Sequence, residues 1–315
     1  LAAAGARWFA VTSVDEGIEL RRHGIGGRLV VLAEFSRDIL NAVAEHNLTL
    51  VIHTVEQLRE LDAWARGREI CPRFHLKLDS GMGRLGLAEA RAGDVADLLA
   101  ACPHLRLEGL ATHFASAEDL GSDQTPDQWR RFQELAAQLA ARGFRPAAVH
   151  AANSAALAYR PETRGSMVRP GLALYGYLMP PRGAPVEAPF RLQPALCWKA
   201  RILAVKDYPA GAPLGYNAAY RTSRPLRVGV VAAGYADGLD RRLSNGGVVL
   251  AGGVRAPIVG LVSMDVSLVD LSRTPAVRPG DSVTLLGRDG DQTLDAAEIA
   301  AHCGTIPYEI LCRIG

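Results

Sequence analysis

The sequence contains little lysine, no closely spaced pair of cysteines and no long apolar run. Of its 35 basic residues only three are lysines, Lys77, Lys199 and Lys206. Its five cysteines form no C-x-x-C pair, which argues against a disulfide framework and favours a reducing, cytoplasmic compartment. No apolar segment reaches the length of a membrane span, so we expect no membrane partner. A net charge of +2 gives no electrostatic reason to expect a nucleic-acid partner.

Metal-ligand patterns are also missing. The eight histidines include no H-x-x-x-H pair, and no cluster of cysteine and histidine has metal-site spacing, so we expect no metal. The composition, 49% hydrophobic and 22% charged over 315 residues, is that of a soluble globular protein with room for a large barrel or two domains. The chain begins without methionine and ends abruptly at Arg313-Ile314-Gly315, which indicates a fragment.

Residues 1–180 alternate between apolar, strand-like runs and helical patterns. Strands are predicted at 7–14, 29–34, 48–53, 73–78, 105–114, 147–151 and 167–175. Helices are predicted at 15–22, 37–46, 55–66, 88–100 and 126–141, with a shorter one from Asn153. Ser36 and Thr54 precede two of these helices and are predicted to be their N-caps.

This alternation favours an α/β fold with a parallel sheet, because most of the strands are too apolar to leave one face in water. A closed parallel barrel has eight strands, and seven are predicted here. Since the opening LAAAGA looks like the end of a helix, we predict a (β/α)8 TIM barrel whose first strand is missing. A doubly wound open sheet is the alternative, but no G-x-G-x-x-G motif follows a strand.

The composition changes between residues 177 and 194, where clustered prolines indicate a linker. After it, short apolar runs at 199–205, 226–232, 247–250 and 282–286 are separated by glycine and proline, and one helix is predicted at 295–301. We therefore predict a barrel domain at 1–180 and a mainly β C-terminal domain at 190–315.

Residues 75–86, HLKLDSGMGRLG, combine the end of a strand, a glycine-rich turn and two cations. Lys77 lies on the strand and Arg84 in the turn after it. Like charges this close repel each other, so Lys77 must be deprotonated, paired with an anion or chemically modified. The alternative is a solvated strand end that carries two ordinary surface cations.

Other polar residues also follow predicted strands, and in a parallel barrel functional groups collect at the carboxyl ends of the strands. They are His113, His150 with Asn153 and Ser154, and Arg169 with Gly171. Ser154 and the Arg169-Pro170-Gly171 segment suit a phosphate, because a hydroxyl and free backbone N–H groups at a helix start bind such an anion. A lone histidine such as His113 is more often a hydrogen-bonded structural residue.

The predicted β domain adds two tyrosines in glycine-flanked turns, Tyr216 and Tyr235. A tyrosine in such a position is more often a packing residue with a solvent-exposed hydroxyl. From the residues alone, a packing role and a functional role both stay open.

Eight segments stand out together: HLKLDSGMGRLG, GLATHFA, HAANSAA, MVRPGLALYG, GYNAAY, AAGYADG, VGLVSMD and IPYEI. In this order, over nearly the whole chain, they resemble the alanine racemase family. The resemblance implies a homodimeric enzyme that binds pyridoxal 5′-phosphate (PLP) and interconverts L- and D-alanine through an aldimine. D-Alanine of this origin supplies the peptidoglycan of bacterial cell walls.

The resemblance assigns catalytic roles to three residues. Tyr216 resembles the family's tyrosine acid/base, which removes or returns the Cα proton in the active site of the partner subunit. Arg169 resembles the arginine that faces the pyridine nitrogen of PLP, where a permanently charged donor leaves this nitrogen unprotonated. His113 resembles the residue that bridges this arginine and the tyrosine.

The same resemblance assigns the binding residues. The cofactor contacts are Ser154, the backbone at Gly171 and Leu172, and Tyr308, all at the phosphate, together with His150 and Asn153. Met264 and Asp265 resemble the substrate-side pair that the partner subunit contributes. Arg84 resembles the arginine that binds the phenolic oxygen of PLP and the substrate carboxylate. Lys77 matches a lysine that is carbamylated in members of the family, which would place an anion beside Arg84.

The chain departs from the family in one respect. The family's PLP lysine lies on the first barrel strand, in a segment that this sequence does not contain, together with a tyrosine that binds phosphate. None of the three lysines present can replace it. We therefore expect the chain as given not to racemise by the two-base route, whereas the full-length protein should.

Three alternatives follow from the same motifs. A broad-specificity or serine racemase would differ only in the residues that line the pocket. A non-catalytic PLP-binding barrel protein would lack the β domain, so the GYNAAY segment argues against it. A related decarboxylase would use a cysteine-centred site, and none of the five cysteines lies in a matching motif.

Overall fold

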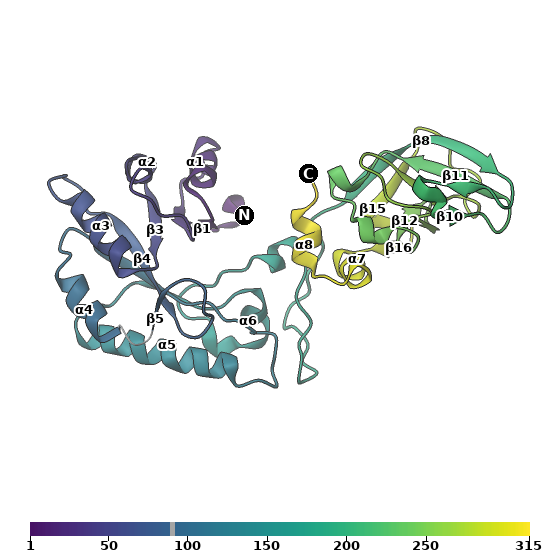
Figure 1. The fold of residues 1–315 in the computed structure, drawn as a ribbon. Coiled ribbons are helices and arrows are strands. Elements are labelled where there is room, and N and C mark those ends of the chain that lie inside the picture. The colour runs from purple at the N-terminus through teal and green to yellow at the C-terminus, as the bar shows by residue number, and fades with distance from the viewer. Residues whose placement is uncertain (89–91) are drawn as a thin grey trace. The chain divides into compact units, whose positions relative to one another are not determined.

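The computed structural model describes residues 1–88 and 92–315. The chain forms two compact units (Figure 1). The first comprises Leu1–Gly171 and Leu178–Arg191, and the second comprises Leu172–Tyr177 and Leu192–Gly315. Most of the proline-rich segment predicted as a linker, Leu178–Arg191, therefore belongs to the first unit. The short stretch before it, Leu172–Tyr177, belongs to the second unit.

Parallel strands form the sheet of the first unit (Figure 1). Its order is β1-β2-β3-β4-β6-β7, with β5 paired to β4. The strands are β1 (Trp8–Val11), β2 (Arg28–Val31), β3 (Leu48–Ile52), β4 (Arg73–Asp79), β5 (Leu87–Ala88), β6 (Arg106–Ala111) and β7 (Ala148–His150). Every residue of β3 is buried, as expected of a strand covered on both faces. The predicted barrel-type parallel sheet is confirmed, in an open, curled form.

Helices follow most of these strands along the chain. They are α1 (Val14–Arg22), α2 (Leu40–Glu45), α3 (Val55–Ala65), α4 (Ala92–Ala100), α5 (Gln124–Ala141) and α6 (Ser154–Tyr159), with short 3-10 turns at Ala2–Ala4 and Pro161–Thr163. The apolar core of the unit lies between helices and sheet, where Leu50 and Leu76 of the strands share one cluster with Leu58 of α3 and Phe132 of α5.

Side-chain caps explain where several helices begin. The Thr54 hydroxyl accepts a hydrogen bond from the Gln57 N–H at 3.1 Å, so the predicted cap of α3 is confirmed. The predicted Ser36 cap is wrong, because α2 begins only at Leu40. The hydroxyl of Ser36 instead bonds to the carboxylate of Asp38, a short-range contact that competes with capping.

Two further predictions need correction. Residues 167–175 form no strand: the chain runs irregularly to Gly171 and then makes a 3-10 turn, Leu172–Tyr175. Pro170 lacks the N–H that a sheet ladder requires, which explains why the apolar pattern misleads. The helix predicted at 88–100 includes residues 89–91, which lie outside the described residues, and α4 begins at Ala92.

Antiparallel strands dominate the second unit (Figure 1). The main sheet has the order β13-β12-β15-β8-β11-β14 with β16 on β15, and β9 pairs with β10. The strands are β8 (Trp198–Tyr208), β9 (Pro213–Leu214), β10 (Tyr220–Arg221), β11 (Leu226–Val231), β12 (Val248–Ala251), β13 (Val254–Pro257), β14 (Ser267–Asp270), β15 (Ser282–Asp289) and β16 (Gln292–Leu294). The predicted mainly β character is confirmed.

Two helices, not the single one predicted, close the second unit. Helix α7 (Ala296–Cys303) begins at Asp295, whose carboxylate accepts from the Glu298 N–H at 2.8 Å. Helix α8 (Pro307–Cys312) was missed because six residues are too few to show a helical period. Among the described residues, no helix is long and apolar enough to cross a membrane.

Candidate active site

A cavity of about 570 Å³ lies at the carboxyl ends of the strands of the first unit. The residues around it that the sequence singled out are Lys77, Arg84, His113, His150, Arg169 and Gly171. Apolar side chains such as Leu32, Val51 and Leu85 form much of the remaining wall. None of the described residues lining the cavity is acidic, so the site is electropositive and suits an anionic ligand.

Arg169 is the best-anchored side chain in this cavity. Its NH2 group donates to the carbonyl oxygens of Thr112 at 2.7 Å and Ala151 at 3.0 Å. The same guanidinium approaches two histidine nitrogens, His150 Nδ1 at 2.7 Å and His113 Nδ1 at 3.3 Å. Burial lowers the pKa of Arg169 to about 10, so the side chain is still protonated at neutral pH.

Both histidines beside Arg169 are held in their neutral form. Burial first, and then the charge of Arg169, lowers the pKa of His150 to about 2 and that of His113 to about 4. Because the guanidinium can only donate, Nδ1 of each ring must accept, and the ring proton of each lies on Nε2. His113 therefore offers an N–H donor on the side opposite Arg169.

A third histidine extends this chain of contacts below the cavity. His75 is fully buried, its Nδ1 lies 2.8 Å from Nε2 of His150, and its Nε2 lies 3.8 Å from the carboxylate of Glu108. Sequence analysis missed both His75 and Glu108. The signal was present for His75, since it is two residues before Lys77 and a strand places such residues on the same face.

Lys77 lies where two arginines repel its charge. Burial, then Arg84 and Arg169, lowers its pKa to about 8, against the attraction of Asp79. At pH 7 about one molecule in ten then carries a neutral amine. Asp79 itself is engaged by the turn, because its Oδ1 accepts from the N–H groups of Gly81, Met82 and Gly83 at 3.0, 2.8 and 3.1 Å.

The predicted phosphate residues of the first unit meet at one point. The backbone N–H of Gly171 donates to the hydroxyl of buried Ser154 at 3.0 Å. Space is open around Gly171, since a Cβ there would meet nothing within 4 Å. Asn153 caps α6 by accepting from the Ala156 N–H at 2.9 Å, which gives this side chain a structural task. A helix of six residues adds little dipole of its own.

The remaining predicted residues belong to the second unit and are exposed. Tyr216 is 69% exposed, Met264 54% and Tyr308 41%, and Asp265 is exposed as well. Leu172 is buried and opens the turn Leu172–Tyr175. Exposed tyrosine and methionine side chains on one unit are typical of surfaces that meet another molecule.

Backbone geometry holds Tyr216 in its exposed position. It opens the 3-10 turn Tyr216–Ala218, in which Asn217 and Ala218 have positive φ angles of 59° and 50°. Asn245 donates to the Ala219 carbonyl at 3.0 Å and accepts from the Gly260 N–H at 2.6 Å, so it links this turn to the segment before Met264. No local sequence pattern indicates this link.

The fold and the cavity define a class: a parallel barrel-type unit with an electropositive small-molecule site, followed by an antiparallel unit. The sequence matches the family model of the alanine racemase N-terminal domain over residues 1–179 and that of the C-terminal domain over 195–315. The chain belongs to the alanine racemase family.

Individual relatives and solved structures agree with this assignment. An alanine racemase of Symbiobacterium thermophilum is 43% identical over 311 residues, which is 99% of this chain and 82% of the relative. The crystal structure of alanine racemase from E. faecalis superposes with a TM-score of 0.89 at 32% identity, over 99% of this chain and 82% of that one. The Bartonella henselae alanine racemase, solved with covalently bound pyridoxal phosphate, gives a TM-score of 0.86 at 28% identity, over 100% and 84%.

Proposed function

We propose that this chain binds PLP at the cavity of its first unit and serves the interconversion of L- and D-alanine. The observation that carries the proposal is the gathering of Lys77, Arg84, His113 and Arg169 around one cavity in a member of this family. The cavity volume, about 570 Å³, lies within the range of about 300–1,000 Å³ found for small-molecule sites.

The residues present fit both the phosphate group and the pyridine ring of the cofactor. Ser154 and the backbone of Gly171, with Leu172 and Tyr308, would hold the phosphate, and the paired hydroxyl and N–H of the first two support this role. Arg84 and Arg169 would hold the ring substituents and the pyridine nitrogen. PLP, when bound, stabilises negative charge that develops at the substrate Cα.

Arg169 and His113 would control the protons around the ring. A guanidinium that stays charged donates to the pyridine nitrogen without protonating it, which limits the electron withdrawal and favours proton return at Cα. Arg169 is suited to this role because two carbonyl oxygens and two histidines fix its orientation. His113, neutral and with its proton on Nε2, would link Arg169 to the tyrosine hydroxyl.

Tyr216 would remove or return the Cα proton through its hydroxyl, in the site of a second copy of the chain. Met264 and Asp265 would reach the same partner site, with the Met264 N–H near the substrate carboxylate. The homodimer is supported by the exposure of Tyr216 and Met264, large side chains on two segments that Asn245 links. Sedimentation of the chain as a monomer at micromolar concentration would contradict the shared site.

Lys77 is proposed to be carbamylated. Its lowered pKa supplies the neutral amine, whose nitrogen bonds to the carbon of CO2 and releases one proton to solvent, and the resulting carbamate is an anion next to Arg84 and Arg169. Intact-protein mass spectrometry under mild conditions, with and without bicarbonate, tests this. A mass increase of one CO2 that is absent from Lys77→Ala supports the modification, and an unchanged mass rejects it.

Cytoplasmic location and supply of cell-wall precursors are proposed with the racemase activity. All five cysteines are free thiols in the structure, which suits a reducing compartment. The role in peptidoglycan follows only from what D-alanine is used for. The test is to express the protein in a bacterium that grows only with added D-alanine. Growth without added D-alanine would support both points.

The central experiment measures PLP absorbance and D-alanine formation from L-alanine. Binding is measured on the chain as given, and turnover on protein extended upstream by a first barrel strand with its lysine. Yellow protein that racemises alanine supports the proposal. Yellow protein that prefers serine or another amino acid points to a broader racemase, and protein that takes up no PLP contradicts the cofactor assignment.

A further inference from the structure

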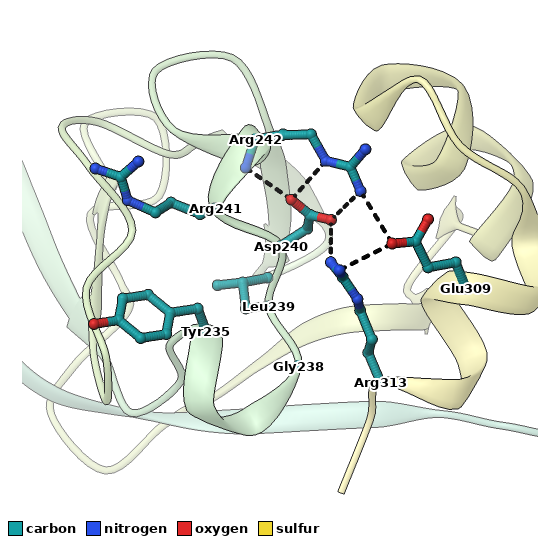
Figure 2. A pocket seen from close by; sticks show the side chains of 8 residues that line it. All are labelled: Tyr235, Gly238, Leu239, Asp240, Arg241, Arg242, Glu309 and Arg313. Atoms are coloured by element: carbon teal, nitrogen blue, oxygen red, sulfur yellow. Dashed lines mark hydrogen bonds and ion pairs between the residues drawn. The ribbon is translucent and has the colours of Figure 1, made fainter.

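Four charged side chains of the second unit form a closed ring beside a cavity of about 580 Å³ (Figure 2). The Asp240 Oδ2 accepts from Arg242 NH2 at 2.6 Å and from Arg313 NH1 at 2.8 Å. The Glu309 Oε1 lies 2.9 Å from Arg313 NH2 and 3.6 Å from Arg242 NH2. Positive and negative charges therefore alternate around the ring. The two positive and two negative charges of the ring sum to zero.

Asp240 is the buried member of the ring. Its side chain is 4% exposed, whereas those of Arg242, Arg313 and Glu309 are 37–48% exposed. The second oxygen of Asp240 is also satisfied, by the N–H and Nε of Arg242 at 2.8 and 3.0 Å. Removal of this one carboxylate would leave two adjacent guanidinium groups with only Glu309 between them, so like-charge repulsion would open the ring.

The ring fastens the loop before Asp240 to helix α8. Glu309 and Arg313 come from α8 and its end, and Tyr308 is the second residue of this helix. The backbone makes the same connection, because Gly238 has a φ of 100° and a Cβ there would lie 2.2 Å from the Arg313 carbonyl oxygen. The loop and helix α8 are thus joined both by ion pairs and by a main-chain contact.

The other end of this loop is fastened to Met264. The N–H of Tyr235 donates to the Ser263 carbonyl at 2.9 Å, and the N–H of Ala236 donates to the Met264 carbonyl at 3.0 Å. A Cβ on Gly234 would lie 2.1 Å from the Met264 oxygen, so the two segments pack backbone to backbone. Figure 2 shows that Tyr235 and Arg241 point away from the ring, so the side chains of this segment that contact Glu309 and Arg313 are Asp240 and Arg242.

We propose that Asp240 is a positioning residue whose ring with Arg242, Glu309 and Arg313 fixes Tyr308 relative to Met264. The ring thereby sets how tightly the chain holds the phosphate group of its cofactor. This inference rests on the proposed function in one respect, the assignment of Tyr308 to the phosphate. The geometric part, a loop anchored to Met264 at one end and to α8 at the other, is independent of it.

The test compares the binding of PLP with that of pyridoxal, which lacks the phosphate. Asp240→Asn keeps the size of the side chain and one oxygen for the Arg242 N–H, and removes the charge. We expect PLP to bind about tenfold more weakly to this variant, and pyridoxal with unchanged affinity, in equilibrium titrations of the full chain. Asp240→Glu, which restores the charge, should recover most of the preference for PLP.

Glu298→Gln is the matched control. Glu298 of α7 forms a two-pronged ion pair with Arg255 in the same unit, and neither residue belongs to the ring. This variant should lower the melting temperature less than Asp240→Asn does, because both partners of its ion pair are exposed, and it should leave the ratio of pyridoxal to PLP affinity unchanged. Arg313→Gln, which removes the contacts of Arg313 with Asp240 and Glu309 and leaves Asp240 paired with Arg242, repeats the test if Asp240→Asn does not fold.

Hydrogen exchange gives a readout that needs no cofactor. The amides of α8 should exchange faster in Asp240→Asn and at the parental rate in Glu298→Gln. Equal loss of PLP and pyridoxal binding, or unchanged exchange in α8, overturns the positioning role. Parent protein that binds no PLP, but shows the expected exchange in Asp240→Asn, overturns the phosphate assignment and leaves the ring as a purely structural device.

Discussion

The two units hold the residues that we propose for the site in opposite ways. In the first unit the reactive groups are buried and tied to one another, as with Arg169, whose guanidinium contacts His113, His150 and two backbone carbonyls. In the second unit Tyr216, Met264 and Tyr308 are exposed, and the backbone around them provides the order. Burial shifts the pKa values of ionisable groups in the first unit, as with His113 and His150.

The difference predicts how substitutions divide. A change in the first unit should alter stability and chemistry together, because its polar groups are desolvated and replacing one leaves its partners unsatisfied. A change in the exposed part of the second unit should alter chemistry alone. Substitutions in each of the two units test this rule.

The largest effect is expected for Tyr216→Phe. Removal of a general acid/base typically costs a factor of about 10²–10⁴ in rate, so kcat/KM for alanine racemisation should fall by that factor in the extended protein. Because phenylalanine keeps the aromatic ring and the side chain is 69% exposed within its own chain, the melting temperature should stay within about 1 °C of the parental value.

Tyr235→Phe is the control, since Tyr235 is a second exposed tyrosine, at 45%, of the same unit. It should retain far more activity than Tyr216→Phe. Equal losses in the two variants would mean that any exposed tyrosine of this unit matters, and would remove the specific acid/base role of Tyr216.

Gly109→Ala should destabilise the first unit by about 1–3 kcal/mol. A Cβ at Gly109 would lie 2.5 Å from the ring of His75, which is fully buried and hydrogen-bonded to His150. The added methyl group must displace that ring, so PLP binding should weaken as well. Chemical unfolding and a PLP titration measure the two effects.

Gly26→Ala provides the comparison within the same unit. A Cβ at this position meets nothing within 4 Å, so the free energy of unfolding should change by less than about 0.5 kcal/mol. If Gly26→Ala and Gly109→Ala lowered the free energy of unfolding equally, the cause would be the change to alanine and not the contact with His75.

The sequence predicts those parts of the fold that depend on local pattern. Strand β3 and the Thr54 cap of α3 follow from an apolar run and from a threonine placed before a helix. The gathering of Lys77 and His113 follows from the rule that functional groups lie at the carboxyl ends of parallel strands, whereas Arg169 reaches the same cavity from an irregular segment.

The parts that the sequence does not reveal depend on contacts between distant residues. The carbonyl oxygens that fix Arg169 belong to the main chain and leave no trace in the sequence. The Asp240 ring joins residues 73 positions apart. The apolar pattern at 167–175 indicates a strand, but local geometry at Pro170 prevents it.

The pH dependence of stability tests the comparison between the two units, because Lys77 of the first unit is partly buried. Its pKa is about 8 in the folded chain against 10.5 for a free lysine. Between these values the unfolded chain binds more protons, so stability should rise with pH from about 8 to 10.5. Lys77→Met should abolish that rise and stabilise the protein at pH 7 by about 2 kcal/mol, below the full linkage value because water reaches part of the side chain.

Lys199→Met separates this effect from the loss of a positive charge as such. Lys199 is exposed on β8, and its replacement should leave the pH profile unchanged. The measurement is urea unfolding from pH 7 to 10.5 in buffer freed of CO2. A parental profile in Lys77→Met would show that the lysine is not desolvated.

The smallest effect is expected for Ala218→Gly. Ala218 has a φ of 50°, a left-handed conformation that costs an alanine about 1–2 kcal/mol, and glycine relieves this cost while adding about 0.5–1 kcal/mol of chain entropy. The net result should be a gain of about 0.5 kcal/mol in stability, with slower racemisation because the turn that presents Tyr216 becomes looser. Ala219→Gly, one residue later with a φ of −61°, should instead lose stability. A loss in both variants would show that no strain is stored in this turn and that backbone order around Tyr216 comes from Asn245 alone.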